Sequence, residues 1–212
     1  MGHMINGLTE DHAQETPIKI LAFAGSLRND SYNKHLLQAA ARLLPKSTEL
    51  EIFGIENIPL YNQDVELRGM PESVKEFKVK IENANAVLIA TPEYNHSYPG
   101  VLKNAIDWAS RPYGNNSFNN KPTTIISASP GQFGGITAQD QLKHVLLALN
   151  THLVTQPAVI VSMAQQKFDE NGNLTDPTTA QSLKQLLENL IAFTKKLQTQ
   201  ETQQPLLVPL LH

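Results

Sequence analysis

The stretch FAGSLRNDSYN, residues 23–33, joins an apolar run to a helical pattern through a short polar loop. The run before it, residues 18–24, is almost unbroken apolar sequence of strand length, which is typical of a parallel strand buried on both faces. After it, leucine and alanine recur at helical spacing from Leu36 to Leu44, and Asp30 or Ser31 is a candidate N-cap. The stretch therefore predicts a strand–loop–helix unit.

The loop of this unit has the chemistry of an anion site. A helix N-terminus leaves its first N–H groups unpaired and carries partial positive charge. Arg28 adds a planar set of donors that matches phosphate oxygens, and Ser26, Ser31 and Asn33 add short polar side chains. An ordinary capped loop with a surface arginine is the alternative interpretation.

The loop does not match other common phosphate-binding motifs. It has no G-x-G-x-x-G and no Lys-Ser/Thr ending, which disfavours a dinucleotide-binding edge and an ATPase. The chain has no cysteine, which excludes a cysteine phosphatase.

The remaining sequence alternates strand and helix patterns. Further strands are expected at residues 49–53, 86–90, 123–128 and 158–161. Further helices are expected at residues 71–83, with Val74, Phe77, Val79 and Ile81 as apolar positions, at 100–111, in a stretch through Leu149, and in a last stretch through Phe193. Five strands alternating with five helices predict an α/β fold, a doubly wound parallel sheet with helices on both faces, for which we expect the order 2-1-3-4-5. Ligands of such sheets bind at the carboxyl ends of the strands, here between strands one and three.

The loop that follows the predicted third strand is the second notable stretch, TPEYNHSYPG at residues 91–100. Its two prolines restrict the backbone and would give the loop a fixed shape. A rigid polar edge suits a flat heteroaromatic ring, and Tyr94 could pack at its side. The alternative is a proline-stiffened connection into the next helix.

Composition limits the classes of function. The formal net charge is -3 and no basic run is present, which argues against nucleic acid as a partner. Without cysteine there is no disulfide, thiolate nucleophile or cysteine metal site, which fits a cytoplasmic protein. No apolar run has the length of a membrane span and no signal pattern is seen. We expect a mobile lead at residues 1–16, one domain at 17–197 and a tail at 198–212, whose apolar end either docks on a neighbour or is disordered.

Together these motifs resemble a known family. The Gly-Ser-x-Arg-x-x-Ser-x-Asn loop, the Thr-Pro-Glu-Tyr-Asn-x-Ser-x-Pro-Gly loop and the run LKNAIDW at residues 102–108 are similar to those of the NADPH-dependent FMN reductases, which include quinone, azo-dye and chromate reductases. The resemblance covers about residues 17–197 and implies a flavodoxin-like fold, with a five-stranded parallel sheet of order 2-1-3-4-5. It implies bound FMN, NADPH or NADH as co-substrate, and a homodimer or homotetramer with the flavin near the subunit interface.

The resemblance also implies a set of cofactor-binding residues. These are Ser26, Arg28, Ser31, Tyr32 and Asn33 around the phosphate, Pro92, Glu93, Tyr94 and Asn95 along the isoalloxazine, and Ser129 and Gly131 at the flavin's other edge. The third loop, residues 129–135, departs from the expected Gly-rich run because it contains Pro130 and Phe133.

With FMN bound, hydride passes from the nicotinamide to the flavin and on to a quinone, azo, chromate-like or flavin acceptor, so no catalytic residue is expected on the protein. Glu93 is a weaker candidate for a general base than for a solvent-side or helix-facing charge, and the histidines lack metal-ligand spacing. Asp107 and Trp108 are expected to anchor the 100–111 helix, with a subunit contact as a further possibility. Arg111 and Tyr113 are hypothesised to reach a neighbouring subunit's site.

Two rival functions stay open. A flavodoxin-like electron carrier would share the sheet, but such carriers usually lack arginine in the phosphate loop and are strongly acidic. Arg28 and the small net charge therefore favour the enzyme. A flavin-binding regulator without turnover is the second rival, and the sequence does not exclude it.

Overall fold

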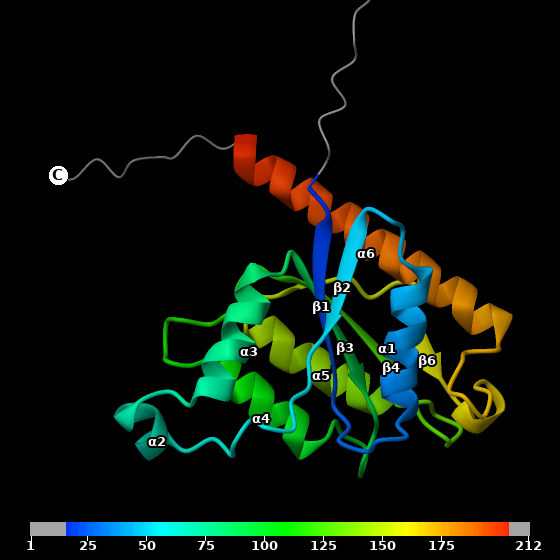
Figure 1. Cartoon of the computed structure of the whole chain (residues 1–212), viewed down its shortest axis with the longest axis horizontal. Coiled ribbons are helices and arrows are strands. Elements are labelled where there is room, and N and C mark those ends of the chain that lie inside the picture. The colour runs from blue at the N-terminus through cyan, green and yellow to red at the C-terminus, as the bar shows by residue number, and fades with distance from the viewer. Residues whose placement is uncertain (1–15, 204–212) are drawn as a thin grey trace, which may run out of the picture.

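The protein folds around one parallel sheet. The computed structural model describes residues 16–203. Its strands are β1 (Ile18–Ala24), β2 (Thr48–Ile52), β3 (Ala86–Thr91), β4 (Pro122–Ala128), β5 (His152–Leu153) and β6 (Val159–Val161). All pairings are parallel and the order is β2-β1-β3-β4-β5, with β6 also paired to β4 (Figure 1). The predicted doubly wound sheet of order 2-1-3-4-5 is confirmed.

The fifth position of the sheet is shared by two short strands. β5 pairs with the start of β4, through Pro122 and His152, and β6 pairs with its end, through Ala128 and Val161. The sequence predicted only the second of these strands. Pro157 lies between them, and because proline has no N–H to donate, it interrupts the ladder at this edge.

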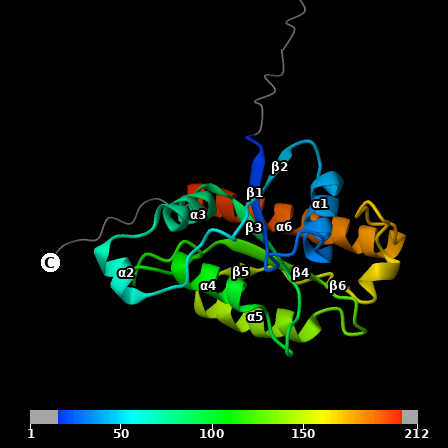
Figure 2. The same cartoon turned by 60° about the horizontal axis from the view of Figure 1, so that its bottom comes forward.

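Helices cover both faces of the sheet. They are α1 (Tyr32–Leu43), α2 (Gln63–Arg68), α3 (Glu72–Asn83), α4 (Gly100–Ala109), α5 (Ile136–Ala148) and α6 (Pro177–Gln203), with a 3₁₀ turn at Ala164–Gln166. Core residues of α1 and α6 pack with Ile20 and Ala22 on one face, and those of α3, α4 and α5 pack with Leu21 and Phe23 on the other (Figure 2). The alternation along β1 follows from the two-residue period of a strand.

Helix α3 differs from its prediction at two neighbouring positions. Val79, predicted to be buried, is 50% exposed, whereas Lys78 is buried. The Lys78 ammonium donates to the carbonyl oxygens of Ala109 and Asn115 and to Ser117 Oγ, at 2.7–3.0 Å. Burial lowers the pKa of Lys78 below its ordinary value. Because its charge has three acceptors, this lysine can occupy an inner position that an apolar pattern assigns to valine.

Helix α2 lies between the predicted strand at residues 49–53 and the predicted helix at 71–83, where the sequence predicted neither a strand nor a helix. It has six residues and buries none of them. Asn62 caps it by accepting from the backbone N–H of Asp64 at 2.8 Å. Such a short helix without an apolar face has no periodicity to detect.

The described part of the chain runs from Thr16 to the end of α6. The predicted lead at residues 1–16 and the end of the predicted tail lie outside the described residues, apart from Thr16 and the stretch from 198 to 203. That stretch belongs to α6, which continues past residue 197 to Gln203. Within residues 16–203, no helix combines the length and apolar character needed to cross a membrane. The helix predicted at 100–111 ends at Ala109.

Candidate functional site

Three polar loops meet at the carboxyl edge of the sheet, the lower edge in Figure 1. They follow β1 (residues 25–31), β3 (92–99) and β4 (129–135). The N–H of Gly25 donates to the carbonyl of Ala90 at 2.8 Å, which joins the first two loops. A Cβ at Gly135 would lie 3.6 Å from the carbonyl oxygen of Thr91, so the third loop lies against the second. The structure thus brings the three predicted loops together.

The loop after β1 holds polar groups without protein partners. Ser26 and Ser31 are buried, and neither hydroxyl has a hydrogen-bond partner within residues 16–203. Ser31 is the N-cap of α1 in extended conformation, but its side chain makes no capping bond. Arg28 is exposed and forms no ion pair in the described part of the chain. Neither of the two hydroxyl oxygens is fully buried, so they reach solvent and are free to donate, and together with the helix start this loop fits a bound anion.

Asn33 and Tyr32, predicted for the same loop, have side chains with other partners. Asn33 Nδ2 donates to the Ala128 carbonyl at 2.9 Å, and Asn33 Oδ1 accepts from the Ala128 N–H at 3.0 Å. This buried amide ties the first turn of α1 to the end of β4. The Tyr32 ring packs against Phe168, with centroids 5.6 Å apart. Asn33 therefore shapes the loop, and its amide is already committed on both sides.

The loop after β3 is a rigid turn. Asn95 and His96 have positive φ of 52° and 59°, and Tyr94 and Ser97 exchange backbone hydrogen bonds at 2.9 and 3.0 Å. Gln141 of α5 braces the turn, since it accepts from Ser97 Oγ at 2.5 Å and donates to the His96 carbonyl at 2.8 Å. Tyr94 remains half exposed. The expected fixed shape is observed, and Gln141 is a supporting residue that no sequence motif indicated.

Glu93 is directed at a helix end. Its Oε2 accepts from the N–H of Ala138, in the first turn of α5, at 3.1 Å. The side chain is only 13% exposed, and His96 Nδ1 lies 3.7 Å from its other oxygen. Glu93 therefore has the helix-facing role considered from the sequence, and it is not a solvent-side carboxylate.

The loop after β4 is tight. Gly131 N–H donates to Ser129 Oγ at 3.1 Å, and the Ser129 and Gly131 carbonyls accept from Ala164 and Met163. Gly134 has positive φ, and a Cβ there would lie 2.7 Å from Ile160, so only glycine fits. Phe133 is 70% exposed at the loop's tip.

The residues predicted near a subunit contact mostly have partners in the same chain. Trp108 is fully buried and its indole N–H donates to the Pro59 carbonyl at 2.8 Å, so it anchors α4. Arg111 Nε donates to Glu66 Oε2 at 3.0 Å. The hydrogen bonds from Arg111 and Tyr61 lower the pKa of Glu66. Tyr113 by contrast is exposed.

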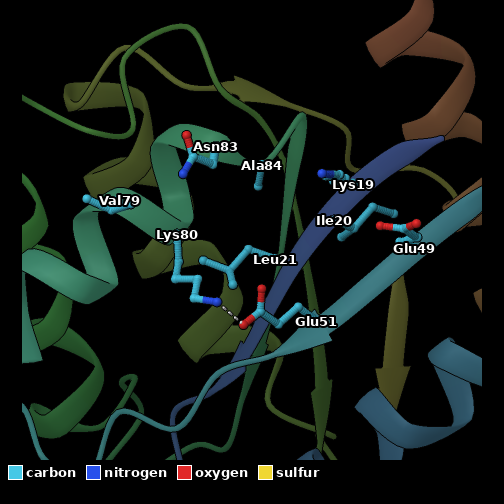
Figure 3. A pocket seen from close by; sticks show the side chains of 9 residues that line it. All are labelled: Lys19, Ile20, Leu21, Glu49, Glu51, Val79, Lys80, Asn83 and Ala84. Carbon is cyan, nitrogen blue, oxygen red and sulfur yellow. Dashed lines mark ion pairs between the residues drawn. The ribbon is translucent and has the colours of Figure 1, made fainter. Parts of the chain in front are cut away.

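Other features do not compete with this site. No group of three His, Cys, Asp or Glu side chains suited to a metal is found among residues 16–203. A hollow of about 370 Å³ lies between α3 and β2 and not at the carboxyl edge (Figure 3). A hollow of about 170 Å³ borders the first loop at Ser26, Leu27 and Lys34. Because the ligand chemistry is at the edge, we place the site there in spite of the larger hollow.

The parallel sheet of order 2-1-3-4-5 with helices on both faces defines a flavodoxin-like fold. Residues 18–166 match the family of NADPH-dependent FMN reductases. An NAD(P)H-dependent FMN reductase of Pseudomonas aeruginosa is 45% identical over 85% of this chain and 97% of its own length. A 2-hydroxy-1,4-benzoquinone reductase of a Burkholderia species is 40% identical over 84% of this chain and 97% of its own. The solved structure of FerB, a flavoenzyme NAD(P)H:acceptor oxidoreductase of Paracoccus denitrificans, aligns with TM-score 0.78 and 38% identity over 84% of this chain and 98% of that one. The chain belongs to the NADPH-dependent FMN reductase family, and is an FMN-dependent oxidoreductase that uses NAD(P)H.

Proposed function

We propose that this reductase passes hydride from NAD(P)H, through bound FMN, to quinone-type acceptors. The observation that carries the proposal is the anion site at the start of α1, open beside a braced loop that could line a flat ring. The quinone class is supported by relatives named quinone reductase and 2-hydroxy-1,4-benzoquinone reductase. Azo compounds, chromate-like oxyanions and free flavin are further candidate acceptors.

In this proposal the phosphate end of FMN lies in the loop after β1. Ser26 and Ser31 donate their hydroxyls, and Arg28 swings onto the phosphate from solvent. Tyr32 contributes its backbone N–H at the helix start, and Asn33 holds the loop in shape through its bonds to Ala128. The donor set suits a phosphate because two hydroxyls and one guanidinium face the same loop and have no partner within residues 16–203.

The isoalloxazine would lie along Pro92, Glu93, Tyr94 and Asn95, with Ser129 and Gly131 at its other edge. These residues present backbone groups whose positions are held from outside the site, by Gln141 and by the contacts of the third loop. Glu93 is occupied with the N-terminus of α5 and does not move a proton. When bound, FMN supplies the acceptance and release of hydride. The protein's part is to position rings and hold them, which is the contribution expected of proximity.

The proposal includes a homodimer or homotetramer and a cytoplasmic location. Leu60, Leu67 and Tyr113 are 78–93% exposed, and the Arg111–Glu66 bond brings the segments that carry them together. Exposed apolar groups of this kind mark interaction surfaces. Sedimentation analysis of the wild type and of Leu67→Asp tests this point. A shift toward the monomer in the variant is expected, and a wild-type monomer would contradict it.

The deciding experiment is anaerobic titration of the FMN-loaded protein with NADPH, followed by addition of a benzoquinone. The flavin absorption band should bleach within seconds and return when the quinone is added. Flavin that binds but is not reduced by NADPH would contradict the reductase and favour a carrier or a regulator. Rapid reduction without reoxidation by quinone would keep the reductase but assign it another acceptor.

A further inference from the structure

A histidine on α1 holds the acidic side chain that precedes the helix. His35 Nε2 lies 2.8 Å from Asp30 Oδ1. Because an ionised carboxylate only accepts hydrogen bonds, Nε2 is the donor of this pair. The Asp30 side chain is 89% exposed, and His35 is its one hydrogen-bond partner among residues 16–203. The residues proposed to bind FMN do not include this pair, although Asp30 lies in the same loop.

The His35 ring is itself held in place by packing. Its side chain is only 16% exposed, and its ring centroid lies 6.2 Å from that of Phe168. Gly172 leaves room for the ring, since a Cβ at this position would collide with Nδ1. Nδ1 is buried and has no partner in the described part of the chain. The bond to Asp30 is therefore the one hydrogen bond that this ring makes there, and it starts from a fixed position.

Without this bond, the Asp30 carboxylate would be free to reach the start of α1. Aspartate side chains readily accept from the backbone N–H two residues further on, which for Asp30 is the N–H of Tyr32. Tyr32 begins α1, and the first N–H groups of a helix have no partner within it. The partial positive charge there attracts a carboxylate as it attracts a phosphate. Asp30 is thus a competitor, within the chain, for donors that we assign to the FMN phosphate.

We propose that His35 is a positioning residue for the cofactor. It holds the Asp30 carboxylate at the side of α1 and so leaves the start of the helix open to the FMN phosphate. The inference rests on the proposed function, in which the phosphate lies in the loop after β1. It agrees with the geometry, because Asp30 is bonded to His35 and the side chain of Ser31, the N-cap, makes no capping bond.

The test measures FMN affinity by fluorescence titration of the full chain stripped of flavin. His35→Leu keeps apolar volume beside Phe168 but removes the donor, and His35→Phe repeats this with a ring. Aspartate caps are favoured roughly fivefold or more, and a site that is mostly capped has an apparent dissociation constant raised by the inverse of its open fraction. FMN should therefore bind about five- to tenfold more weakly to both variants. His35→Gln retains an N–H donor and should stay within about twofold of the wild type.

The decisive variant combines His35→Leu with Asp30→Ala. With the competitor removed, FMN affinity should return to within about twofold of the wild type, which the loss of packing alone would not allow. Riboflavin has no phosphate and should bind equally to His35→Leu and to the wild type. Lys75→Leu is the matched control, because it frees the exposed Glu72 in the first turn of α3, which has no assigned part in flavin binding. FMN affinity should not change in this control.

Each other result overturns the proposal. Unchanged FMN affinity in His35→Leu and His35→Phe means that Asp30 does not compete with the phosphate. A loss that Asp30→Ala does not reverse, or that riboflavin shares, assigns His35 to the packing of the loop. If Arg28→Ala weakens FMN binding and the His35 variants do not, the phosphate site stands and only the role of His35 is refuted. If none of them changes FMN affinity, the proposed phosphate site itself is wrong. Thermal midpoints confirm that all forms are folded.

Discussion

Helices α1 and α5 both begin at the carboxyl edge of the sheet, but only the N-terminus of α5 has an acidic side chain of the protein hydrogen-bonded to it. The first turn of α5 receives the Glu93 carboxylate from the neighbouring loop. The first turn of α1 has no acidic residue and no capping bond from Ser31, while Arg28 lies exposed in the preceding loop. Both ends carry the same partial positive charge. The charge at α5 therefore holds a loop, whereas the start of α1 has no side-chain cap from the protein, which agrees with our proposal that the FMN phosphate binds there.

Giving α1 an anion of its own should remove the difference. Ser31→Asp places a carboxylate where we propose the FMN phosphate binds, and Asp is as good an N-cap as Ser. We expect FMN affinity to fall about 100-fold, or about 3 kcal/mol, through like-charge repulsion and the lost hydroxyl, with no loss of stability. Flavin fluorescence titration and thermal melts measure the two effects. Ser31→Asn is the neutral control, and unchanged affinity in the Asp variant would place the phosphate elsewhere.

Removing the exposed guanidinium should weaken the same site less. Arg28→Ala is expected to cost about 1.5–3 kcal/mol of FMN binding, the scale of a hydrogen bond to a charged group. Stability should not change, because Arg28 has no protein partner among residues 16–203. Arg28→Lys keeps the charge without the planar donors and should fall between the two. Flavin fluorescence titration measures the FMN affinity of each variant. An Arg28→Ala variant that binds FMN like the wild type would refute the role of Arg28 at the phosphate.

The N-terminus of helix α6 is a third case, because it is capped by Asp176, the residue directly before the helix. Asp176 Oδ2 accepts from the Thr179 hydroxyl and N–H at 2.5 and 2.8 Å, and these bonds hold the pKa of Asp176 below its ordinary value of 3.8. Because the pKa of Asp176 is lower in the folded than in the unfolded state, its ionised form stabilises the fold. This contribution to the free energy of unfolding is fully present above the unfolded-state pKa and is lost as the pH falls through the folded-state pKa. Asp176→Ala should lower the free energy of unfolding by about 1 kcal/mol near neutral pH.

The pH dependence separates this cap from other effects of the substitution. The difference between wild type and Asp176→Ala should shrink as the pH falls from about 5 to about 2. Urea unfolding at several pH values measures it. Asp176→Asn, a neutral cap of similar shape, should cost less at neutral pH. A difference that does not vary with pH would show that the carboxylate charge contributes nothing.

Neutralising the anion of α5 should have the smallest effect. Glu93→Gln keeps an acceptor for the Ala138 N–H but removes the charge at the helix end, which is expected to cost about 0.5–1 kcal/mol of stability. Turnover should stay within about threefold of the wild type, since no proton is assigned to this group. Steady-state rates with NADPH and a quinone test the point. A loss of two orders of magnitude in turnover with FMN still bound would make Glu93 a participant in the reaction.

Much of this arrangement could be predicted from local pattern. The apolar runs located the strands, and the two polar loops predicted after β1 and β3 do lie at the same edge of the sheet. Two kinds of element were missed. Helix α2 buries no residue and β5 has two residues, so neither has a period that sequence can reveal. Val79 followed the apolar pattern of α3, yet it is 50% exposed and lines a hollow between α3 and the edge strand β2.

The sequence by itself determined which chemical groups are present and on which elements. It placed hydroxyls and an arginine at the start of a helix after β1 and a proline-rich loop after β3. It also predicted a parallel sheet, which brings both loops to one edge. What only the tertiary structure decided is which of those groups are already in use. The Asn33 amide is hydrogen-bonded to the backbone of Ala128, 95 positions away, and the Glu93 carboxylate to the backbone of Ala138, 45 positions away. Local sequence records the spacing along one element and the chemistry of its ends. Hydrogen bonds between distant elements depend on how the helices dock on the sheet. The start of α5, which meets Glu93, and the start of α1, which no side chain caps, therefore become different only when the chain has folded.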